Sequence, residues 1–366
     1  MKVLISGGGT GGHIFPAVSI ANAIKKALPD TEFLFIGANG RMEMEKVPAE
    51  GYKIIGLPVQ GFIRPLNSPK NLKVLYNLYR SIKKAKNIIK EFRPDVAVGV
   101  GGYASAAALK AAHALGVPYV LQEQNGFGGV TNQQLAKNAR KICVAYPNME
   151  RFFPADRIVL TGNPVRQSLL ECTATIEESR KTFELEPTLP TIFITGGSLG
   201  ARSVNESIAA GLEELEKAGV QVLWQTGKAD GDKWKNLIEE KGIKHIHPTV
   251  FVADMAKAYR AADIVISRSG AGAVNEICLI GKASILVPLP TAAEDHQTAN
   301  ARALSSKDAA ILIPDKDARD ILVKEAIKLV SDKARIISME EKARAMGKVG
   351  AADTIAKIVI EEARKQ

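Results

Sequence analysis

Short apolar runs alternate with longer amphipathic stretches along the whole chain of 366 residues. The apolar runs are rich in Val, Ile and Leu, which predicts buried strands of parallel sheets, and the amphipathic stretches predict helices that cover those sheets. In the first half we expect strands near residues 2–6, 32–36, 53–57, 96–100, 118–122, 141–145 and 157–160. In the second half we expect strands near residues 191–195, 221–225, 244–247, 263–267, 284–288 and 310–313.

A turn separates the two series of strands. Residues 161–166 read TGNPVR, and proline both stops a helix and biases the residue before it toward extended backbone. Because the chain is long enough to bury two cores, we expect an α/β protein of two domains, 1–163 and 164–345, each built on a parallel sheet covered by helices. A final helix, expected over 346–366, has no strand after it, so its pattern alone leaves open which domain it joins.

Each half begins with a strand that runs into a glycine-rich loop. The first loop reads GGGTGGH at residues 7–13, and the second reads GGSLGA at residues 196–201. Glycines at the start of a helix let backbone N–H groups approach an anion such as a phosphate. The first loop fits G-x-G-x-x-G, but no carboxylate ends the next strand to hold a ribose, so NAD is disfavoured. His13 stands where a Walker loop needs Lys, and a glycine turn that only packs strand against helix stays open.

The excess of positive over negative charge lies in the first half of the chain. Residues 1–151 hold 20 Lys and Arg against 9 Asp and Glu, and residues 152–366 hold 29 against 30. The excess is densest over residues 70–93, where cations surround Leu, Ile and Tyr at helical spacing. This stretch fits a basic amphipathic helix on an anionic membrane surface, or an ordinary crossover helix with a solvated face. No nucleic-acid-binding motif accompanies the charge.

Cysteine spacing and hydropathy limit the remaining classes. Cys143, Cys172 and Cys278 are too widely spaced for a disulfide framework or a zinc site, and we expect them to be buried. No run of 18 apolar residues and no leader pattern is present, so we expect a cytoplasmic protein without a membrane span.

Chemically unusual loops follow the expected strands, at the sheet edge where open parallel sheets bind ligands. In chain order they read GGGTGGH, GVGGYAS, QEQNG, GNPVR, GGSLGA and SRSGAGAVNE, followed by DHQ and NA. This combination resembles the MurG family of peptidoglycan glycosyltransferases, which add N-acetylglucosamine to undecaprenyl-pyrophosphoryl-muramoyl pentapeptide. The resemblance implies an α/β protein of GT-B architecture, with two Rossmann-like, doubly wound parallel-sheet domains facing a cleft. It also implies that a terminal helix packs back onto the first domain.

The resemblance also implies how the donor, UDP-N-acetylglucosamine, is held, mainly by the second domain. Glu276 would accept bonds from both ribose hydroxyls, Ser198 would bond a phosphate, and residues 251–255 would read the uracil edge. Structural alternatives remain for three of these residues: Ser198 could cap a helix, Arg166 could form an ion pair, and Val252 could pack in the core. The expected donor-binding residues are Thr10, Gly11, Gly12, Asn125, Arg166, Ser198, Val252, Ala271, Gly272, Ala273, Val274, Asn275, Glu276 and Gln297.

The implied reaction joins C1 of the donor sugar to the 4-hydroxyl of the muramoyl acceptor with inversion, so it needs a base near that hydroxyl. His13 is the expected base, with Glu123 as the rival, although His13 could equally cap a helix or bind phosphate. Gly102 and Tyr103, together with the first glycine loop, would form the acceptor pocket. Because no Asp-x-Asp pattern supplies a metal site beside the diphosphate, we expect no metal cofactor, and helix N-termini and Arg268 would stabilise the leaving diphosphate.

The family resemblance also favours a peripheral location on the cytoplasmic face of the cell membrane, through the basic stretch at 70–93. Expected partners are UDP-N-acetylglucosamine, the lipid-linked muramoyl pentapeptide, an anionic membrane surface and other cell-wall synthesis proteins, with no nucleic acid. Three alternatives remain open: a glycolipid synthase, a UDP-N-acetylglucosamine 2-epimerase and a non-catalytic nucleotide-sugar binding module.

Overall fold

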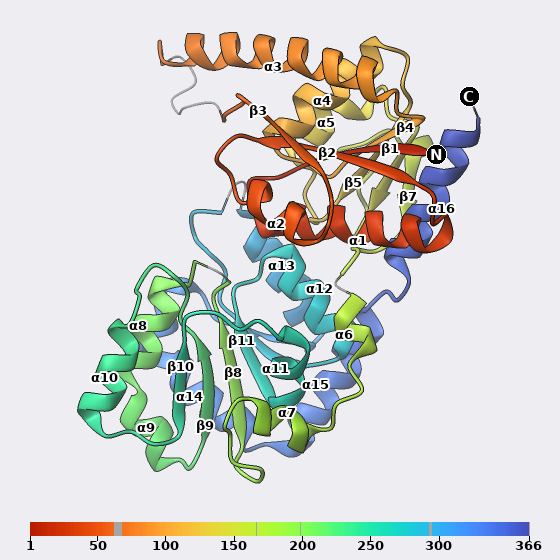
Figure 1. Cartoon of the computed structure of the whole chain (residues 1–366). Coiled ribbons are helices and arrows are strands. Elements are labelled where there is room, and N and C mark those ends of the chain that lie inside the picture. Colours follow the sequence, from red (N-terminus) through yellow and green to blue (C-terminus); the bar gives the residue numbers. More distant parts are fainter. Residues whose placement is uncertain (62–67, 166, 198, 293–294, 366) are drawn as a thin grey trace. The chain divides into compact units, whose positions relative to one another are not determined.

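The computed structural model describes residues 1–61, 68–165, 167–197, 199–292 and 295–365 (Figure 1). The chain divides into two compact units. The first unit comprises Met1–Arg166 with Lys348–Gln366, and the second comprises Gln167–Gly347. Each unit is a parallel sheet with helices on both faces.

The first unit is built on a seven-stranded parallel sheet in the order β3-β2-β1-β4-β5-β6-β7. Its strands are β1 (Lys2–Ser6), β2 (Glu32–Ala38), β3 (Ile54–Leu57), β4 (Val96–Gly99), β5 (Tyr119–Glu123), β6 (Lys141–Val144) and β7 (Ile158–Leu160). Its helices are α1 (Gly11–Ala27), α2 (Glu43–Ala49), α3 (Asn71–Phe92), α4 (Tyr103–Ala114), α5 (Val130–Ala136), the 3-10 turn η1 (Ala155–Arg157) and α16 (Ala351–Arg364).

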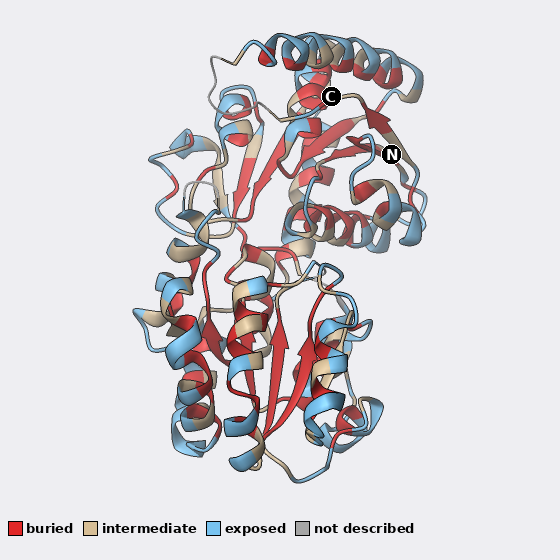
Figure 2. Ribbon diagram, turned by 90° about the vertical axis from the view of Figure 1, so that its left-hand side faces the viewer, coloured by how far each residue is buried: buried red, intermediate tan, exposed pale blue. Residues whose placement is uncertain are grey.

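Alternate residues of β1 point into two separate cores, as a pleated strand requires. Leu4 packs with side chains of α3, α4 and α5, whereas Val3 and Ile5 pack with α1 and α16. The central strands are therefore buried on both faces, while the helices expose one side to solvent (Figure 2).

The second unit repeats this plan with six parallel strands in the order β10-β9-β8-β11-β12-β13. Its strands are β8 (Thr191–Thr195), β9 (Gln221–Gln225), β10 (Ile246–Thr249), β11 (Ile264–Ser267), β12 (Ala283–Leu286) and β13 (Ile311–Leu312). Its helices are α6 (Gln167–Glu171), α7 (Ile176–Thr182), α8 (Arg202–Ala210), α9 (Leu212–Lys217), α10 (Lys233–Lys241), α11 (Met255–Ala261), α12 (Ala271–Ile280), α13 (His296–Ser305), η3 (Asp315–Asp317), α14 (Ala318–Val330) and α15 (Lys333–Met346).

Every strand expected from the apolar pattern is present, with ends within two residues of the expectation. The final helix begins later than expected. Met346 ends α15 in the second unit, where the C-cap Gly347 adopts extended backbone, and α16 starts only at Ala351, after its N-cap Gly350 with a left-handed φ of 77°. Helix α16 then packs against α1 of the first unit, through residues that include Ile355 and Val359.

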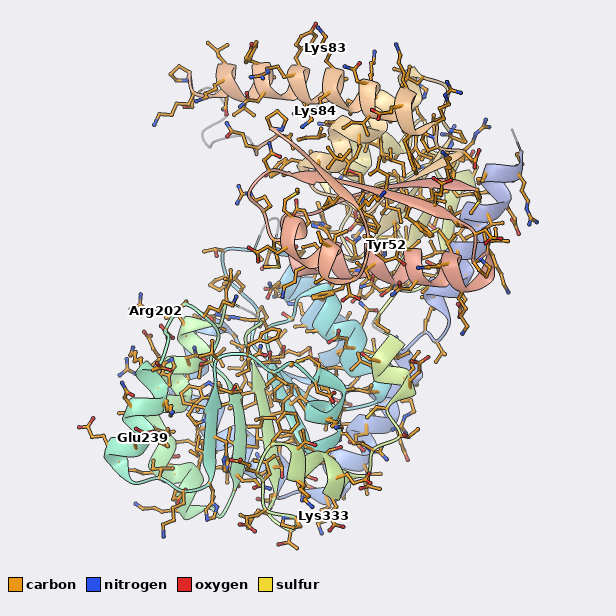
Figure 3. All side chains as sticks on the ribbon, in the orientation of Figure 1. Tyr52, Lys83, Lys84, Arg202, Glu239 and Lys333 are labelled. Carbon is orange, nitrogen blue, oxygen red and sulfur yellow. The ribbon has the colours of Figure 1, made fainter. Side chains whose placement is uncertain are left out.

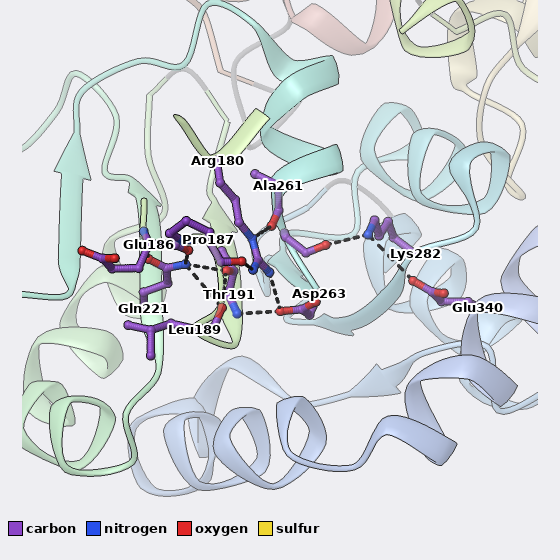
Figure 4. A network of polar contacts seen from close by, with 11 residues as sticks. Arg180, Glu186, Pro187, Leu189, Thr191, Gln221, Ala261, Asp263, Lys282 and Glu340 are labelled. Atoms are coloured by element: carbon purple, nitrogen blue, oxygen red, sulfur yellow. Dashed lines mark hydrogen bonds and ion pairs between the residues drawn. The ribbon is translucent and has the colours of Figure 1, made fainter. Parts of the chain in front are cut away.

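A buried polar network ties the amino ends of β8 and β11 together in the second unit (Figure 4). Arg180 forms a 3.0 Å ion pair with Asp263, and the same carboxylate oxygen accepts a 2.7 Å bond from the backbone N–H of Thr191. Lys282 donates to the carbonyl of Ala262 and lies 3.8 Å from Glu340, and burial lowers the pKa of this lysine. Because the network lies at the strand ends opposite the glycine loops, we interpret it as structural.

The described cysteines form no disulfide. Cys143 and Cys278 are buried, and burial raises the pKa of each thiol to about 12. Both therefore behave as small apolar core residues. Cys172 is partly buried.

None of the helices in the described part of the chain is long and apolar enough to cross a membrane.

Candidate active site

In each unit the strand order reverses at one point, between β1 and β4 in the first and between β8 and β11 in the second. Doubly wound sheets bind ligands at this reversal, beyond the carboxyl ends of the strands. Both glycine loops follow the strands that flank the reversals, β1 and β8, and the loops at residues 100–102 and 268–272 follow their neighbours β4 and β11. The fold therefore brings the motifs together within each unit.

The two loops of the first unit touch backbone to backbone. A Cβ added at Gly102 would lie 2.7 Å from the carbonyl oxygen of Gly8, and one added at Gly7 would lie 2.0 Å from a methyl carbon of Val100. Gly102 also has a φ of 86°, which side-chain-bearing residues rarely adopt. Helix α1 begins after Thr10 and helix α4 begins after Gly102. No side chain caps either helix, so the first N–H groups of both helices have no side-chain acceptor at the cap.

His13 lies in the first turn of α1 and faces both loops. Its Nδ1 is 3.0 Å from the carbonyl oxygen of Gly8 and 3.4 Å from the hydroxyl of Thr10, while its Nε2 lies 2.9 Å from the position of a Cβ at Gly101. A carbonyl oxygen only accepts, so the 3.0 Å contact with Gly8 is a hydrogen bond in the tautomer that carries its proton on Nδ1, and in that tautomer Nε2 is the basic nitrogen.

Glu123, the rival base, holds a loop in place. Its Oε1 accepts bonds from the backbone and side chain of Asn125, at 3.2 and 3.3 Å. Its Oε2 accepts bonds from the N–H of Gly129 and the side chain of Asn132, both at 2.9 Å. Because both oxygens of this buried carboxylate organise residues 125–132, the geometry favours a structural role for Glu123 and makes His13 the better base candidate.

In the second unit Gln225, which the sequence analysis did not single out, connects the glycine loop to the expected uracil segment. Its Nε2 donates to Thr195 Oγ1 at 3.0 Å and to the carbonyl of Gly197 at 3.1 Å. Its Oε1 accepts a 2.9 Å bond from the N–H of Val252. The backbone N–H of Val252 is therefore already bonded within the protein, which leaves its carbonyl as the group with which to read a base.

Helix α12 carries most of the expected donor residues. Its N-cap is Gly270 and no side chain caps it, so the N–H groups of Ala271, Gly272 and Ala273 form an open helix N-terminus. A Cβ added at Gly270 or Gly272 would meet nothing within 4 Å. The first turn therefore has room for a bound anion.

Glu276 lies one turn further along α12, and it is 8% exposed. Its Oε2 accepts a 3.0 Å bond from the hydroxyl of Tyr259. Val274, on the same helix, is a buried core residue, and the amide of Asn275 donates to the carbonyl of Ala271 at 2.8 Å. Asn275 is thus bonded to its own helix, and the carboxylate of Glu276 is the stronger candidate for a ligand contact.

Arg268 was expected to stabilise a leaving diphosphate, but its guanidinium is bonded within the second unit. Nη1 donates to Asp315 and, at 3.1 Å, to the carbonyls of Val287 and Pro288, and Nη2 donates to Ser203 at 2.8 Å. These bonds link the ends of β11 and β12 to α8, so Arg268 acts as a structural connector.

Gln297, at the start of α13, lies near the end of β12. Its Oε1 accepts a 3.0 Å bond from the N–H of Leu289, and its backbone carbonyl accepts a 2.8 Å bond from the hydroxyl of Ser269. Gln297 is therefore fixed beside the loop that precedes α12. Arg166 and Ser198 lie outside the described residues, so their expected roles stay predictions.

Within the described ranges no three His, Cys, Asp or Glu side chains are grouped so that they could hold a metal ion.

The comparisons with known proteins agree with this fold. Residues 3–144 match the N-terminal domain of glycosyltransferase family 28, and residues 191–355 match its C-terminal domain. A relative from Parabacteroides distasonis is 52% identical over 355 residues, which cover 97% of this chain and 96% of the relative. A Bacteroides fragilis relative is 52% identical over 367 residues, or 100% and 96% of the two chains. Both are named UDP-N-acetylglucosamine–N-acetylmuramyl-(pentapeptide) pyrophosphoryl-undecaprenol N-acetylglucosamine transferase.

Solved structures share the architecture. The crystal structure of Acinetobacter baumannii MurG superposes with a TM-score of 0.77 at 28% identity, covering 98% of this chain and 99% of that one. A UDP-GlcNAc 2-epimerase from Neisseria meningitidis has a TM-score of 0.65 at 16% identity, covering 100% of both chains, which shows a common fold alone.

Two doubly wound units with glycine loops at both switch points form the GT-B architecture, which the MurG crystal structure shares. The chain belongs to glycosyltransferase family 28.

Proposed function

We propose that this family 28 enzyme transfers N-acetylglucosamine from UDP-N-acetylglucosamine to the 4-hydroxyl of the muramoyl pentapeptide carried on pyrophosphoryl-undecaprenol. The observation that carries this proposal is the 52% identity, over nearly the whole length, to transferases named for this reaction. The two switch-point sites support it, because the reaction needs one site for a nucleotide sugar and one for a second diphosphate-linked substrate.

The second unit binds the donor in this proposal. The N–H groups of the first turn of α12 receive the diphosphate, since no side chain caps them and the space at Gly270 and Gly272 is open. Glu276 accepts bonds from the ribose hydroxyls, and Tyr259 orients its carboxylate. The amide of Gln297 and, from the first unit, the amide of Asn125 bond sugar hydroxyls in this proposal, because an amide offers both donors and an acceptor.

The first unit binds the acceptor. The loop at Thr10–Gly12 and the segment at Gly102–Tyr103 form its pocket, where the first turns of α1 and α4 supply N–H groups to the acceptor diphosphate. His13 takes the proton of the 4-hydroxyl on Nε2 as that oxygen attacks C1 and the bond from C1 to the UDP oxygen breaks with inversion.

The chemistry requires no metal in this proposal. Negative charge that develops on the leaving UDP is stabilised by the N-terminus of α12, where the dipole and the uncapped N–H groups act without rearrangement. Arg268 does not take part, because its bonds to Asp315, Ser203 and two carbonyls occupy both terminal nitrogens.

Product analysis with and without acceptor tests this reaction. Incubation with UDP-N-acetylglucosamine and a short-chain analogue of the lipid-linked muramoyl pentapeptide is expected to give a β-1,4-linked disaccharide lipid and UDP in equal amounts. Donor alone is expected to remain unchanged. Inversion at C2 of the donor sugar would instead identify an epimerase, and donor binding without any product would identify a binding module.

We also propose that α3 brings the enzyme to the cytoplasmic face of the cell membrane, where its lipid-linked acceptor would lie. Leu72, Leu75, Tyr76 and Tyr79 are all more than half exposed on this helix. Cations lie along the same helix, and Lys83 points away from the unit whereas Lys84 turns back to the carbonyl of Gly56 in β3, at 2.8 Å (Figure 3). An exposed apolar stripe flanked by cations is typical of helices that lie in the interface of an anionic bilayer. Contacts with other cell-wall synthesis proteins at this membrane are part of the same proposal.

Vesicle sedimentation tests the membrane proposal. Wild-type protein is expected to bind vesicles that contain phosphatidylglycerol and to be released by high salt, since each nearby cation contributes about 1 kcal/mol of electrostatic attraction. A Tyr76→Ser, Tyr79→Ser variant should bind more weakly, whereas Lys333→Gln, in α15 of the other unit (Figure 3), should bind like wild type. Equal binding of all three proteins would contradict a role for α3.

A further inference from the structure

Glu43 is a buried carboxylate beneath the first glycine loop, and the proposed transfer reaction assigns it no role. It is the first residue of α2 and is 1% exposed. Its Oε2 accepts a 2.9 Å bond from the backbone N–H of Gly9, and its Oε1 accepts a 3.0 Å bond from the N–H of Ala38, at the end of β2. Burying a carboxylate costs several kcal/mol unless its partners are well placed, so two aimed N–H groups mark a built position.

Two glycines make room for this carboxylate. A Cβ at Gly8 would lie 2.1 Å from Oε1 of Glu43, and a Cβ at Gly37 would lie 2.6 Å from its Cγ. Any side chain at either position would collide with Glu43. The glycine loop is thus shaped around a carboxylate of the protein itself, as well as for a ligand.

The bond from Gly9 connects Glu43 to His13 through a single peptide group. The N–H of Gly9 and the carbonyl of Gly8 are the two ends of the same peptide unit. Glu43 accepts from the N–H end at 2.9 Å, and His13 Nδ1 lies 3.0 Å from the oxygen at the other end. A carboxylate on the N–H end polarises the peptide and makes its oxygen a stronger acceptor, because hydrogen bonds in a chain reinforce one another.

We propose that Glu43 is a positioning residue that holds His13 in the tautomer protonated on Nδ1, acting through the Gly8–Gly9 peptide. In many catalytic sites a carboxylate accepts a bond directly from the Nδ1–H of a histidine and so fixes the orientation and tautomer of the ring. Here one peptide group lies between the carboxylate and the histidine, and the effect on the ring is the same. Oriented in this way, Nε2 is the nitrogen that can take a proton. The inference rests on the proposed function only in assigning that proton to the acceptor hydroxyl.

The imidazole ¹⁵N chemical shifts of His13, measured by NMR at a pH where the ring is neutral, test the tautomer directly. The wild-type ring is expected to show a protonated Nδ1 and an unprotonated Nε2, and His13→Gln assigns the signals. In Glu43→Gln the side-chain NH₂ faces one of the two N–H donors, so the loop loses a bond and the ring should move toward a mixture of tautomers. Glu45→Gln is the matched control, because Glu45 is exposed on the same helix.

Transfer kinetics supply the second readout. Glu43→Gln is expected to lower kcat about 10- to 100-fold with little change in KM for the nucleotide sugar, as when a group acting in the transition state is misplaced. In a His13→Ala background the same substitution should cost almost nothing further, since both changes remove one function.

The outcomes separate this inference from the proposed function. A wild-type His13 protonated on Nε2 would overturn the inference without any variant, even if Glu43→Gln failed to fold. An unchanged tautomer in folded Glu43→Gln, or a full additional loss in the His13→Ala background, would also overturn it. If wild-type protein transfers no sugar, the proposed function fails while the tautomer measurement still decides the role of Glu43.

Discussion

The hydroxyl of Tyr259 donates a 3.0 Å hydrogen bond to Oε2 of Glu276. Tyr259 is buried in α11, with its ring packed edge-on against Phe193 of β8 at a centroid distance of 5.5 Å. The core of the second unit therefore fixes the direction of a carboxylate near the open end of α12. A rigid acceptor at that position suits recognition of a diol such as a ribose.

Replacing Glu276 by Gln should weaken donor binding. A hydrogen bond to a charged group contributes about 1.5 to 3 kcal/mol, so we expect the dissociation constant for UDP to rise about 10- to 100-fold, measured by isothermal titration calorimetry. Tyr259→Phe should give a smaller rise, because the carboxylate stays but loses its orienting donor. Glu239→Gln, at an exposed position of α10, is the control and should bind UDP like wild type. Unchanged affinity in Glu276→Gln would remove this residue from the donor site.

Gly102→Ala should disable the first unit through a backbone collision. The new Cβ would meet the carbonyl of Gly8 at 2.7 Å and would also require a φ of 86°, which together should cost several kcal/mol of stability and displace the loop that holds His13. Gly40→Ala is the matched control, because Gly40 has a φ of 66° with open space around it and should cost only about 1 kcal/mol. Circular dichroism during denaturation and kcat/KM for transfer measure the two effects. Similar losses in both variants would show that the loop contact is unimportant.

The second unit should lose stability on mild acidification because of His247 in β10. Desolvation and, to a lesser extent, the neighbouring His245 lower the pKa of His247 below its ordinary value of 6.5. Between the folded and unfolded pKa values the unfolded chain binds more protons, so the free energy of unfolding rises with pH across this window. The free energy of unfolding therefore has its full value above about pH 6.5 and decreases as the pH drops toward the pKa of His247 in the folded protein.

Tryptophan fluorescence isolates this effect, because both tryptophans, Trp224 and Trp234, lie in the core of the second unit. Urea denaturation of His247→Gln between pH 5 and 8 should show a flatter dependence on pH than wild type. His113→Gln, an exposed position in α4 of the first unit, should leave the wild-type dependence intact. A wild-type midpoint independent of pH in this range would contradict the assignment.

The apolar runs were sufficient to predict the strands. Strands buried on both faces, such as β4 and β11, leave continuous apolar stretches that mark the strand positions, whereas the two Rossmann-like domains were expected from the family resemblance of the loop motifs. The start of α16 was missed because a left-handed glycine, Gly350, decides it, and glycine alone does not reveal its φ.

The site was harder to predict, because residue types do not reveal their partners. Arg268 looked like an anion ligand, yet the ends of neighbouring strands and Asp315 take up its guanidinium. Gln225 and Glu43 carried no visible signal, since each acts through backbone groups that only the folded sheet brings near. Gln225 is the last residue of β9 and Glu43 is the first residue of the short helix α2, and these positions could have marked them for inspection.

The most direct test of the account is transfer of labelled N-acetylglucosamine from UDP-N-acetylglucosamine to the lipid-linked muramoyl pentapeptide analogue, with and without a metal chelator. The account predicts that label enters the lipid fraction at the same rate in both samples and that Glu276→Gln and His13→Gln slow it strongly. If the wild-type protein binds UDP tightly and yet leaves all label on the donor, the proposed acceptor is wrong; if chelator stops transfer, the metal-free mechanism is wrong.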